Sequence, residues 1–205
     1  MAQLVDDVLN MAIQDSTEYR MLRSAIAQSE LALADCKNRD YLPQLRRLHV
    51  WNLANMGDSL YKGGHHSDAL AFYIQAIKVD CDESSVLNQI GVCLILLGKI
   101  ERALYYFELL HRRASTPVDR ALALFNSAIC HKISGNLNEA IIHLRKSLRC
   151  STDDETIAEL DNLKELNSRQ AFRAFKHNIF SKNVLPEAKA VDTHPQRDRS
   201  KEFGG

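Results

Sequence analysis

Residues 87–110, LNQIGVCLILLGKIERALYYFELL, contain the pattern that decides the fold of this chain. The part that begins at Cys93, CLILLGKIERALYYFELLH, aligns with SLYKGGHHSDALAFYIQAI when it is moved back by 34 positions. A third copy, ICHKISGNLNEAIIHLRKSL, follows at a shift of 37, and the three extra residues fall around Ser115, Thr116 and Pro117. A fixed period of this length is typical of stacked helical hairpins.

Each copy has the pattern of two antiparallel helices. Large apolar residues recur three or four apart in the first half, which predicts a helix with one buried stripe. A glycine then ends that helix in the left-handed conformation, and the second helix carries a small residue followed by a large apolar one. The repeat-defining positions are Gly57, Gly64, Ala69, Tyr73, Gly91, Gly98, Ala103, Phe107, Ala128, Gly135 and Ala140.

Gly57 and Gly91 lie inside the predicted first helices. A glycine within a helix costs about 1 kcal/mol relative to alanine. We therefore expect both glycines to lie where another helix packs closely.

These residues resemble the tetratricopeptide repeat, a family of 34-residue helical hairpins with this order of Gly, Ala and aromatic positions, over residues 50 to 151. The resemblance implies an all-α, right-handed helical solenoid of about three hairpins, at residues 50–83, 84–117 and 118–152. Ankyrin arrays have a similar period, but their TPLH-type turn is absent. A 35-residue RNA-reading repeat is the other alternative, and the neutral chain shows no basic groove for it.

The segments that flank the repeats are also predicted to be helical. Residues 3 to 13 and 16 to 36 have amphipathic patterns, Asp15 or Ser16 can cap the second of these helices, and a third helix begins near Pro43. The region 1–49 is either a cap on the array or a self-association surface, which would make the protein a homodimer. Residues 153–182 predict a capping helix whose basic second half could alternatively hold an acidic partner, and the tail 183–205 has a disordered composition.

Composition excludes several classes of function. The 205 residues are 45% hydrophobic and 25% charged, and 26 basic residues balance 26 acidic ones, so there is no general field for nucleic acid. No apolar stretch is long enough to span a membrane, and the first residues lack the basic start of a signal peptide. Five cysteines without a CxxC pair indicate a reduced compartment, and we expect a cytoplasmic protein.

The sequence contains no recognisable catalytic constellation. HExxH, GxSxG, GxxxxGK[ST] and calcium-loop patterns are absent, so we expect no enzyme activity and no cofactor. His65 and His66 lie in a predicted turn without further ligands at metal spacing, and we expect no metal there. Cys93 and Cys130 fall in a repeat column usually filled by alanine and are interpreted as small buried residues.

Protein binding is the remaining function. In tetratricopeptide arrays the first helices line a concave groove for an extended peptide or a partner helix. By resemblance, the groove positions are Trp51, Ala54, Asp58, Tyr61, Asn88, Val92, Ile95, Leu122, Phe125, Ile129 and Lys132. Chaperone co-factors of the family clamp a carboxylate with Lys, Asn and Arg, but the matching positions here are Ala54, Asp58, Asn88, Leu122 and Asn126. Both basic residues are missing, so we expect apolar pockets rather than a carboxylate clamp.

Within the family, NQIGVCLILLGKIERAL and NSAICHKISGNLNEAI are similar to the repeats of class II chaperones of bacterial type III secretion. The chain departs from them in its longer ends and in the three-residue insertion. The resemblance implies a cytosolic chaperone or adaptor that covers an apolar client segment, such as one from a translocator. The alternative is a scaffold subunit that docks into a larger assembly through the N-terminal helices or the helix at 153–181.

Overall fold

The computed structural model describes residues 16–80 and 83–182, with side chains described as far as residue 174. The described residues form helices and turns without a strand, which confirms the all-α fold class. The predicted helix at 3–13 and the tail 183–205 lie outside the described residues. The elements are α2 (Thr17–Asp35), η1 (Arg39–Tyr41), α3 (Leu42–Lys62), α4 (His66–Val79), α5 (Ser84–Leu96), α6 (Ile100–Arg113), α7 (Pro117–Ile133), α8 (Leu137–Cys150) and α9 (Asp154–Lys182).

The chain divides into two units, Met1–Asn167 and Ser168–Gly205. The first unit holds α2 to α8 and the first half of α9. Of the second, the structure describes the last turns of α9, where the side chain of Phe172 is exposed. None of the described helices combines the length and the apolar character that crossing a membrane requires.

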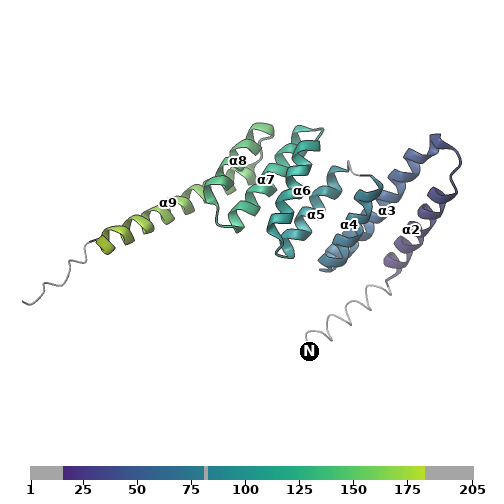
Figure 1. The fold of residues 1–205 in the computed structure, drawn as a ribbon, viewed down its shortest axis with the longest axis horizontal. Helices are drawn as coiled ribbons and strands as arrows, with labels where there is room; N and C mark the ends of the chain where they lie inside the picture. The colour runs from purple at the N-terminus through teal and green to yellow at the C-terminus, as the bar shows by residue number, and fades with distance from the viewer. Residues whose placement is uncertain (1–15, 81–82, 183–205) are drawn as a thin grey trace, which may run out of the picture. The chain divides into compact units, whose positions relative to one another are not determined.

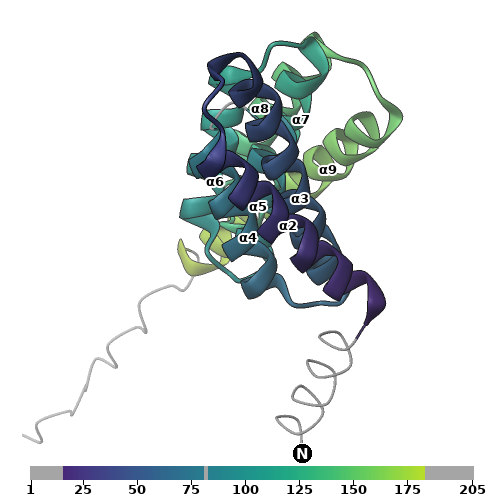
Figure 2. The ribbon, with the colours of Figure 1, turned by 90° about the vertical axis from the view of Figure 1, so that its right-hand side faces the viewer.

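Three helical hairpins, α3–α4, α5–α6 and α7–α8, follow one another along the chain (Figure 1). In the turned view each second helix lies to the left of its first helix (Figure 2). Each hairpin turns at a glycine with positive φ, namely 83° at Gly64, 70° at Gly98 and 79° at Gly135. The residue after each glycine donates its amide to a carbonyl near the helix end; for example, the His65 amide donates to the Leu60 carbonyl.

Two aromatic rings fill the centre of the stack. Tyr73 of α4 and Phe107 of α6 are completely buried. A Cβ on Gly57 would lie 2.5 Å from the Tyr73 ring, and one on Gly91 would lie 2.4 Å from the Phe107 ring. The first and second helices therefore approach more closely than any side chain larger than hydrogen would allow.

The insertion between the second and third copies forms the start of α7. The Thr116 hydroxyl accepts the amide of Asp119 at 3.0 Å, and Pro117 occupies the first helical turn. Proline is tolerated there because the first amides of a helix have no helical acceptor. The three extra residues thus lengthen a connection without disturbing a helix.

Helix α2 packs on the core through Tyr19, Leu22 and Ile26, and polar side chains also join it to α3. The hydroxyl of Ser29 lies 2.8 Å from His49 Nδ1 and accepts Nδ2 of Asn52 at 3.1 Å, and all three residues are buried. Ser16 caps α2 by accepting the amide of Tyr19 at 3.1 Å, as the sequence predicted. Helix α3 begins at Leu42 and continues into the first hairpin without interruption.

The first half of α9 covers the last hairpin. Leu160 and Leu163 are buried in a cluster with Ala128, Ala140 and Leu144. On the same half of α9, Glu159 Oε1 lies 2.6 Å from Lys132 Nζ of α7. This half of α9 is therefore part of the helical stack, and residues at its start line a pocket.

Candidate peptide-binding groove

Two adjoining pockets lie along α5 and α7, and Asn88 and Leu122 line both of them. The larger has a volume of about 480 Å³ and the smaller about 350 Å³. We call their combined surface the α5–α7 groove. The larger pocket is lined by Asn88, Val92, Val118, Ala121, Leu122, Phe125, Asn126, Ser147, Ser151, Asp153, Glu155 and Thr156. The smaller is lined by Ala54, Asp58, Tyr73, Ser84, Ser85, Val86, Asn88, Gln89, Asp119 and Leu122.

The larger pocket has an apolar centre. Val118 is 64% exposed and Leu122 is 40% exposed, although both are large aliphatic side chains. Val92 and Phe125 are half-buried beside them, since their inner faces pack on the hydrophobic core. This surface can remove an apolar side chain of a ligand from water, which stabilises a complex by about 25 cal/mol per Å².

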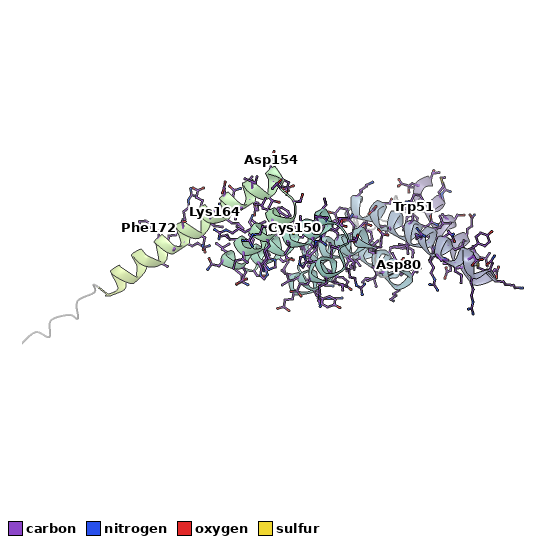
Figure 3. All side chains as sticks on the ribbon, turned by 90° about the horizontal axis from the view of Figure 1, so that it is seen from above. Trp51, Asp80, Cys150, Asp154, Lys164 and Phe172 are labelled. Carbon is purple, nitrogen blue, oxygen red and sulfur yellow. The ribbon has the colours of Figure 1, made fainter. Side chains whose placement is uncertain are left out.

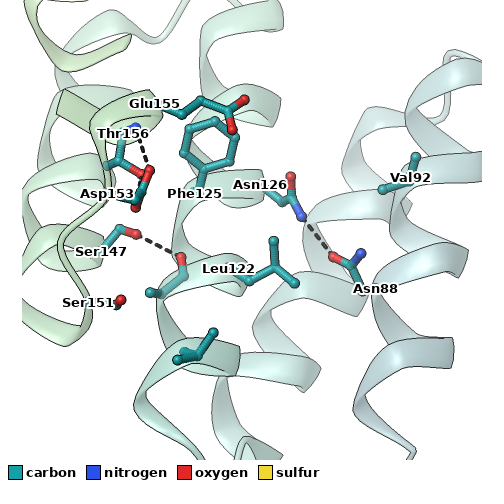
Figure 4. Close-up of a pocket in the computed structure, with 12 residues that line it drawn as sticks. Asn88, Val92, Leu122, Phe125, Asn126, Ser147, Ser151, Asp153, Glu155 and Thr156 are labelled. Carbon is teal, nitrogen blue, oxygen red and sulfur yellow. Dashed lines mark hydrogen bonds between the residues drawn. The ribbon is translucent and has the colours of Figure 1, made fainter. Parts of the chain in front are cut away.

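A pair of amides bridges α5 and α7 within the groove. Nδ2 of Asn126 donates to Oδ1 of Asn88 at 2.8 Å (Figure 4). Among the described residues, Nδ2 of Asn88 and Oδ1 of Asn126 have no hydrogen-bond partner. The pair therefore offers one donor and one acceptor, the two groups that a peptide backbone also presents.

Asp58 accepts hydrogen bonds from two side chains at the smaller pocket. Its Oδ1 accepts the Tyr73 hydroxyl at 2.6 Å and Nε2 of Gln89 at 3.4 Å. Burial raises the pKa of Tyr73, and the hydrogen bond and negative charge of Asp58 raise it further. Tyr73 therefore stays neutral and donates its hydroxyl to Asp58.

The start of α9 forms the far wall of the larger pocket (Figure 4). Asp153 caps the helix, because its carboxylate accepts the amide and the hydroxyl of Thr156, each at 2.7 Å. Ser147 of α8 donates its hydroxyl to the carbonyl of Ala121 at 2.8 Å and fixes α8 against α7. Glu155 is exposed beside this rigid wall.

Some of the predicted groove residues line the two pockets, and the others lie elsewhere. Ala54, Asp58, Asn88, Val92, Leu122 and Phe125 line the two pockets. The other five line neither of them. Trp51 is 62% exposed on α3 (Figure 3), and the Tyr61 ring lies tilted against the His66 ring. Ile95 packs on the core, Ile129 is half-buried, and Lys132 pairs with Glu159.

The sequence did not indicate that the end of the third repeat and the segment after it contribute to the groove. Ser147, Ser151, Asp153, Glu155 and Thr156 line the larger pocket but were not among the predicted positions. The sequence did contain a signal for a helix start at this place. Asp153 is a residue type that favours the N-cap, and it stands three residues before Thr156.

The two buried cysteines lie behind the groove and are protected. Cys93 and Cys130 are 0% and 1% exposed, and burial raises the pKa of each thiol to about 11. Within the described ranges no three His, Cys, Asp or Glu side chains come together as a metal site would require.

Comparison with solved structures identifies the fold. The first tetratricopeptide domain of Spaghetti (RPAP3), bound to the HSP90 peptide SRMEEVD, matches 58% of this chain and 93% of its own, with a TM-score of 0.53 and 16% identity. The fold is that of a tetratricopeptide-repeat array. At this identity the likeness shows the tetratricopeptide fold alone, and no family model and no curated protein matches the sequence.

Two further tetratricopeptide-like structures have the same arrangement. The type III secretion translocator chaperone SycD of Yersinia enterocolitica matches 61% of this chain and 92% of its own, with a TM-score of 0.52 and 17% identity. BtubC (BKLC) of P. vanneervenii matches 90% of this chain and 81% of its own, with a TM-score of 0.58 and 14% identity.

Proposed function

We propose that this protein binds an extended apolar segment of a client protein in the α5–α7 groove and acts as a chaperone or adaptor. The observation that carries the proposal is the pair of adjoining pockets, in which exposed Leu122 lines both and exposed Val118 lines the larger one. A pocket that holds solvent-exposed aliphatic side chains next to fixed polar groups is typical of binding sites.

The Asn88–Asn126 pair favours an extended segment as the ligand. An extended chain exposes its own amides and carbonyls, whereas a helix has already used them. The free donor of Asn88 and the free acceptor of Asn126 would each pair with one such group. The pockets on either side would then take side chains of the client.

The type of client follows in part from what the groove lacks. Within the described part of the chain no lysine or arginine lines either pocket, so the groove as described offers no cation to a terminal carboxylate. A secretion translocator is one client of suitable chemistry: a structure of SycD with a peptide of the translocator YopD is known, and its TM-score to this chain is 0.50. Our hypothesis is that this chain, like SycD, binds a segment of a client protein.

A matched pair of substitutions tests the groove. Leu122 and Ile142 are 40% and 41% exposed, but only Leu122 lines the pockets. Tagged wild type, Leu122→Asp and Ile142→Asp are used to capture clients, which are quantified by mass spectrometry. The client complex is then mapped by hydrogen exchange. We expect a client that Leu122→Asp loses and Ile142→Asp retains, with protection in α5 and α7. Equal capture by all three proteins, or protection elsewhere, would overturn the proposal.

The scaffold function is the second candidate, and exposed apolar side chains on α2 and α3 favour it. Met21, Leu31, Leu48 and Trp51 are between 47% and 67% exposed. A permanent partner would cover such side chains. If Trp51→Ser loses a stoichiometric partner that Leu122→Asp retains, the exposed apolar side chains of α2 and α3 form the interface with that partner.

A further inference from the structure

Among the residues that the structure describes, carboxylates line both parts of the α5–α7 groove, and no lysine or arginine does. Asp153 and Glu155 stand at the larger pocket, and Asp58 and Asp119 at the smaller one. We propose that the client segment carries lysine or arginine side chains next to its apolar residues. This inference rests on the function proposed above and specifies the chemistry of the client.

Helix dipoles reduce this negative charge without cancelling it. Residues from the first turns of α5, α7 and α9 line the pockets, so three helix N-termini face the groove. Each N-terminus is equivalent to about half a positive charge. The α9 start carries three full negative charges, Asp153, Asp154 and Glu155, and the α7 start carries Asp119. The groove edge is therefore negative after this offset.

Most of these carboxylates already accept hydrogen bonds, but only from neutral donors. Asp58 accepts from Tyr73, Asp119 from the Thr116 hydroxyl at 2.9 Å, and Asp153 from Thr156. A neutral donor fixes the position of a carboxylate and leaves its charge in place. Glu155 has no such partner among the described residues, so it is the carboxylate most available to a client.

The arrangement suits a side chain that is apolar along its stem and cationic at its end. Lysine and arginine lay their aliphatic stems on apolar surface and keep the charged group at the edge. Here Val118, Leu122 and Phe125 offer that apolar surface, and the carboxylates stand beside it. Because the whole chain is neutral, with 26 basic and 26 acidic residues, the preference is a local property of the groove.

Synthetic peptides separate charge from apolar contact. Three fluorescein-labelled peptides share one alternating Leu-Ser-Val core and are flanked on both sides by lysine, by glutamine or by glutamate. Affinity for the full chain is measured by fluorescence anisotropy at low and at high salt. We expect the lysine peptide to bind about tenfold more tightly than the glutamate peptide at low salt, because several partly exposed ion pairs add up. The ratio should shrink at high salt, where such pairs are screened.

Two double variants test whether the preference for the lysine peptide arises in the groove. Asp153→Asn/Glu155→Gln removes two charges and keeps the α9 cap, since asparagine caps as well as aspartate. Glu101→Gln/Glu139→Gln removes two charges from the first turns of α6 and α8, which do not line the groove. We expect the first variant to lose most of the difference in affinity between the lysine and the glutamate peptide. The second should behave as wild type.

The outcomes distinguish this inference from the proposed function. Equal binding of the lysine and glutamate peptides, with all binding lost in Leu122→Asp, would overturn the charge inference and leave the groove function standing. A lysine preference that survives in Asp153→Asn/Glu155→Gln would also overturn it. If no peptide binds and Leu122→Asp captures the same clients as wild type, both proposals fail.

Discussion

Gly91 lies against the ring of Phe107 so closely that a Cβ on the glycine would be 2.4 Å from the aromatic carbons. The same relationship joins Gly57 to Tyr73 in the first hairpin. The third hairpin has Ala128 and Leu144 at the corresponding positions, and both are fully buried. The small residue and its partner therefore change together, since a shorter aliphatic side chain leaves room for a methyl group.

Gly91→Ala should lower the free energy of unfolding by about 1–2 kcal/mol. Alanine favours the helix by about 1 kcal/mol, but forcing a methyl into a packed core typically costs 1–3 kcal/mol or more. Gly91→Ala/Phe107→Leu copies the third hairpin and should lose less than the two single variants combined. Urea unfolding followed by circular dichroism measures the cycle. Additive losses would mean that the two residues do not limit each other.

Asp58→Ala should destabilise the protein because it leaves the buried Tyr73 hydroxyl without its acceptor. An unpaired buried polar group costs about 1–3 kcal/mol. Asp58→Ala/Tyr73→Phe removes both partners and should be more stable than Asp58→Ala alone. Thermal unfolding of the three variants and wild type checks this order, and a double variant less stable than Asp58→Ala would contradict it.

Cys93 and Cys130 should resist thiol reagents in the native protein. Their pKa of about 11 is two units above the ordinary 9.0, so the thiolate fraction at pH 8 is about 100-fold lower, and burial adds a steric barrier. Cys36 and Cys150 are half-exposed and should be modified first. Brief iodoacetamide treatment with peptide mapping, with and without denaturant, provides the test. Early labelling of Cys93 in native protein would show that the second hairpin opens readily.

Stability should fall as the pH drops below 6.5. Burial lowers the pKa of His49 and His143 below the ordinary 6.5, so the unfolded chain binds more protons than the folded one in that range. Their contribution is fully present above pH 6.5 and is lost as the pH falls towards the folded-state pKa values. His49→Gln/His143→Gln should show a smaller difference between the unfolding midpoints at pH 7.5 and 5.5. An unchanged difference would assign the effect to other groups.

Most of the fold could be predicted from the sequence because each hairpin repeats the same local signals. The shifts of 34 and 37 residues aligned the glycines, and Gly64, Gly98 and Gly135 do end their helices with positive φ. Pro117 indicated a helix start, and Thr116 caps that helix. These features depend on residues close together in the chain.

The groove was less predictable because its walls depend on packing between repeats. Lys132 was placed in the groove by its column, yet Glu159 of α9 pairs with it, and α9 has no counterpart in the repeat. Asp153 and Glu155 line a pocket only because Leu160 and Leu163 fix α9 on the last hairpin. The predicted self-association through residues 1–49 stays a prediction, since residues 1–15 lie outside the described part of the chain.

The sequential packing of the helices also has a consequence for protein synthesis. Each of α3 to α7 packs mainly on the helix before it and the helix after it. A hairpin can therefore form as soon as the ribosome has released it, without waiting for distant sequence. The larger pocket of the α5–α7 groove is completed only when α9 arrives, so the surface proposed here to bind a client forms after the hairpins beneath it.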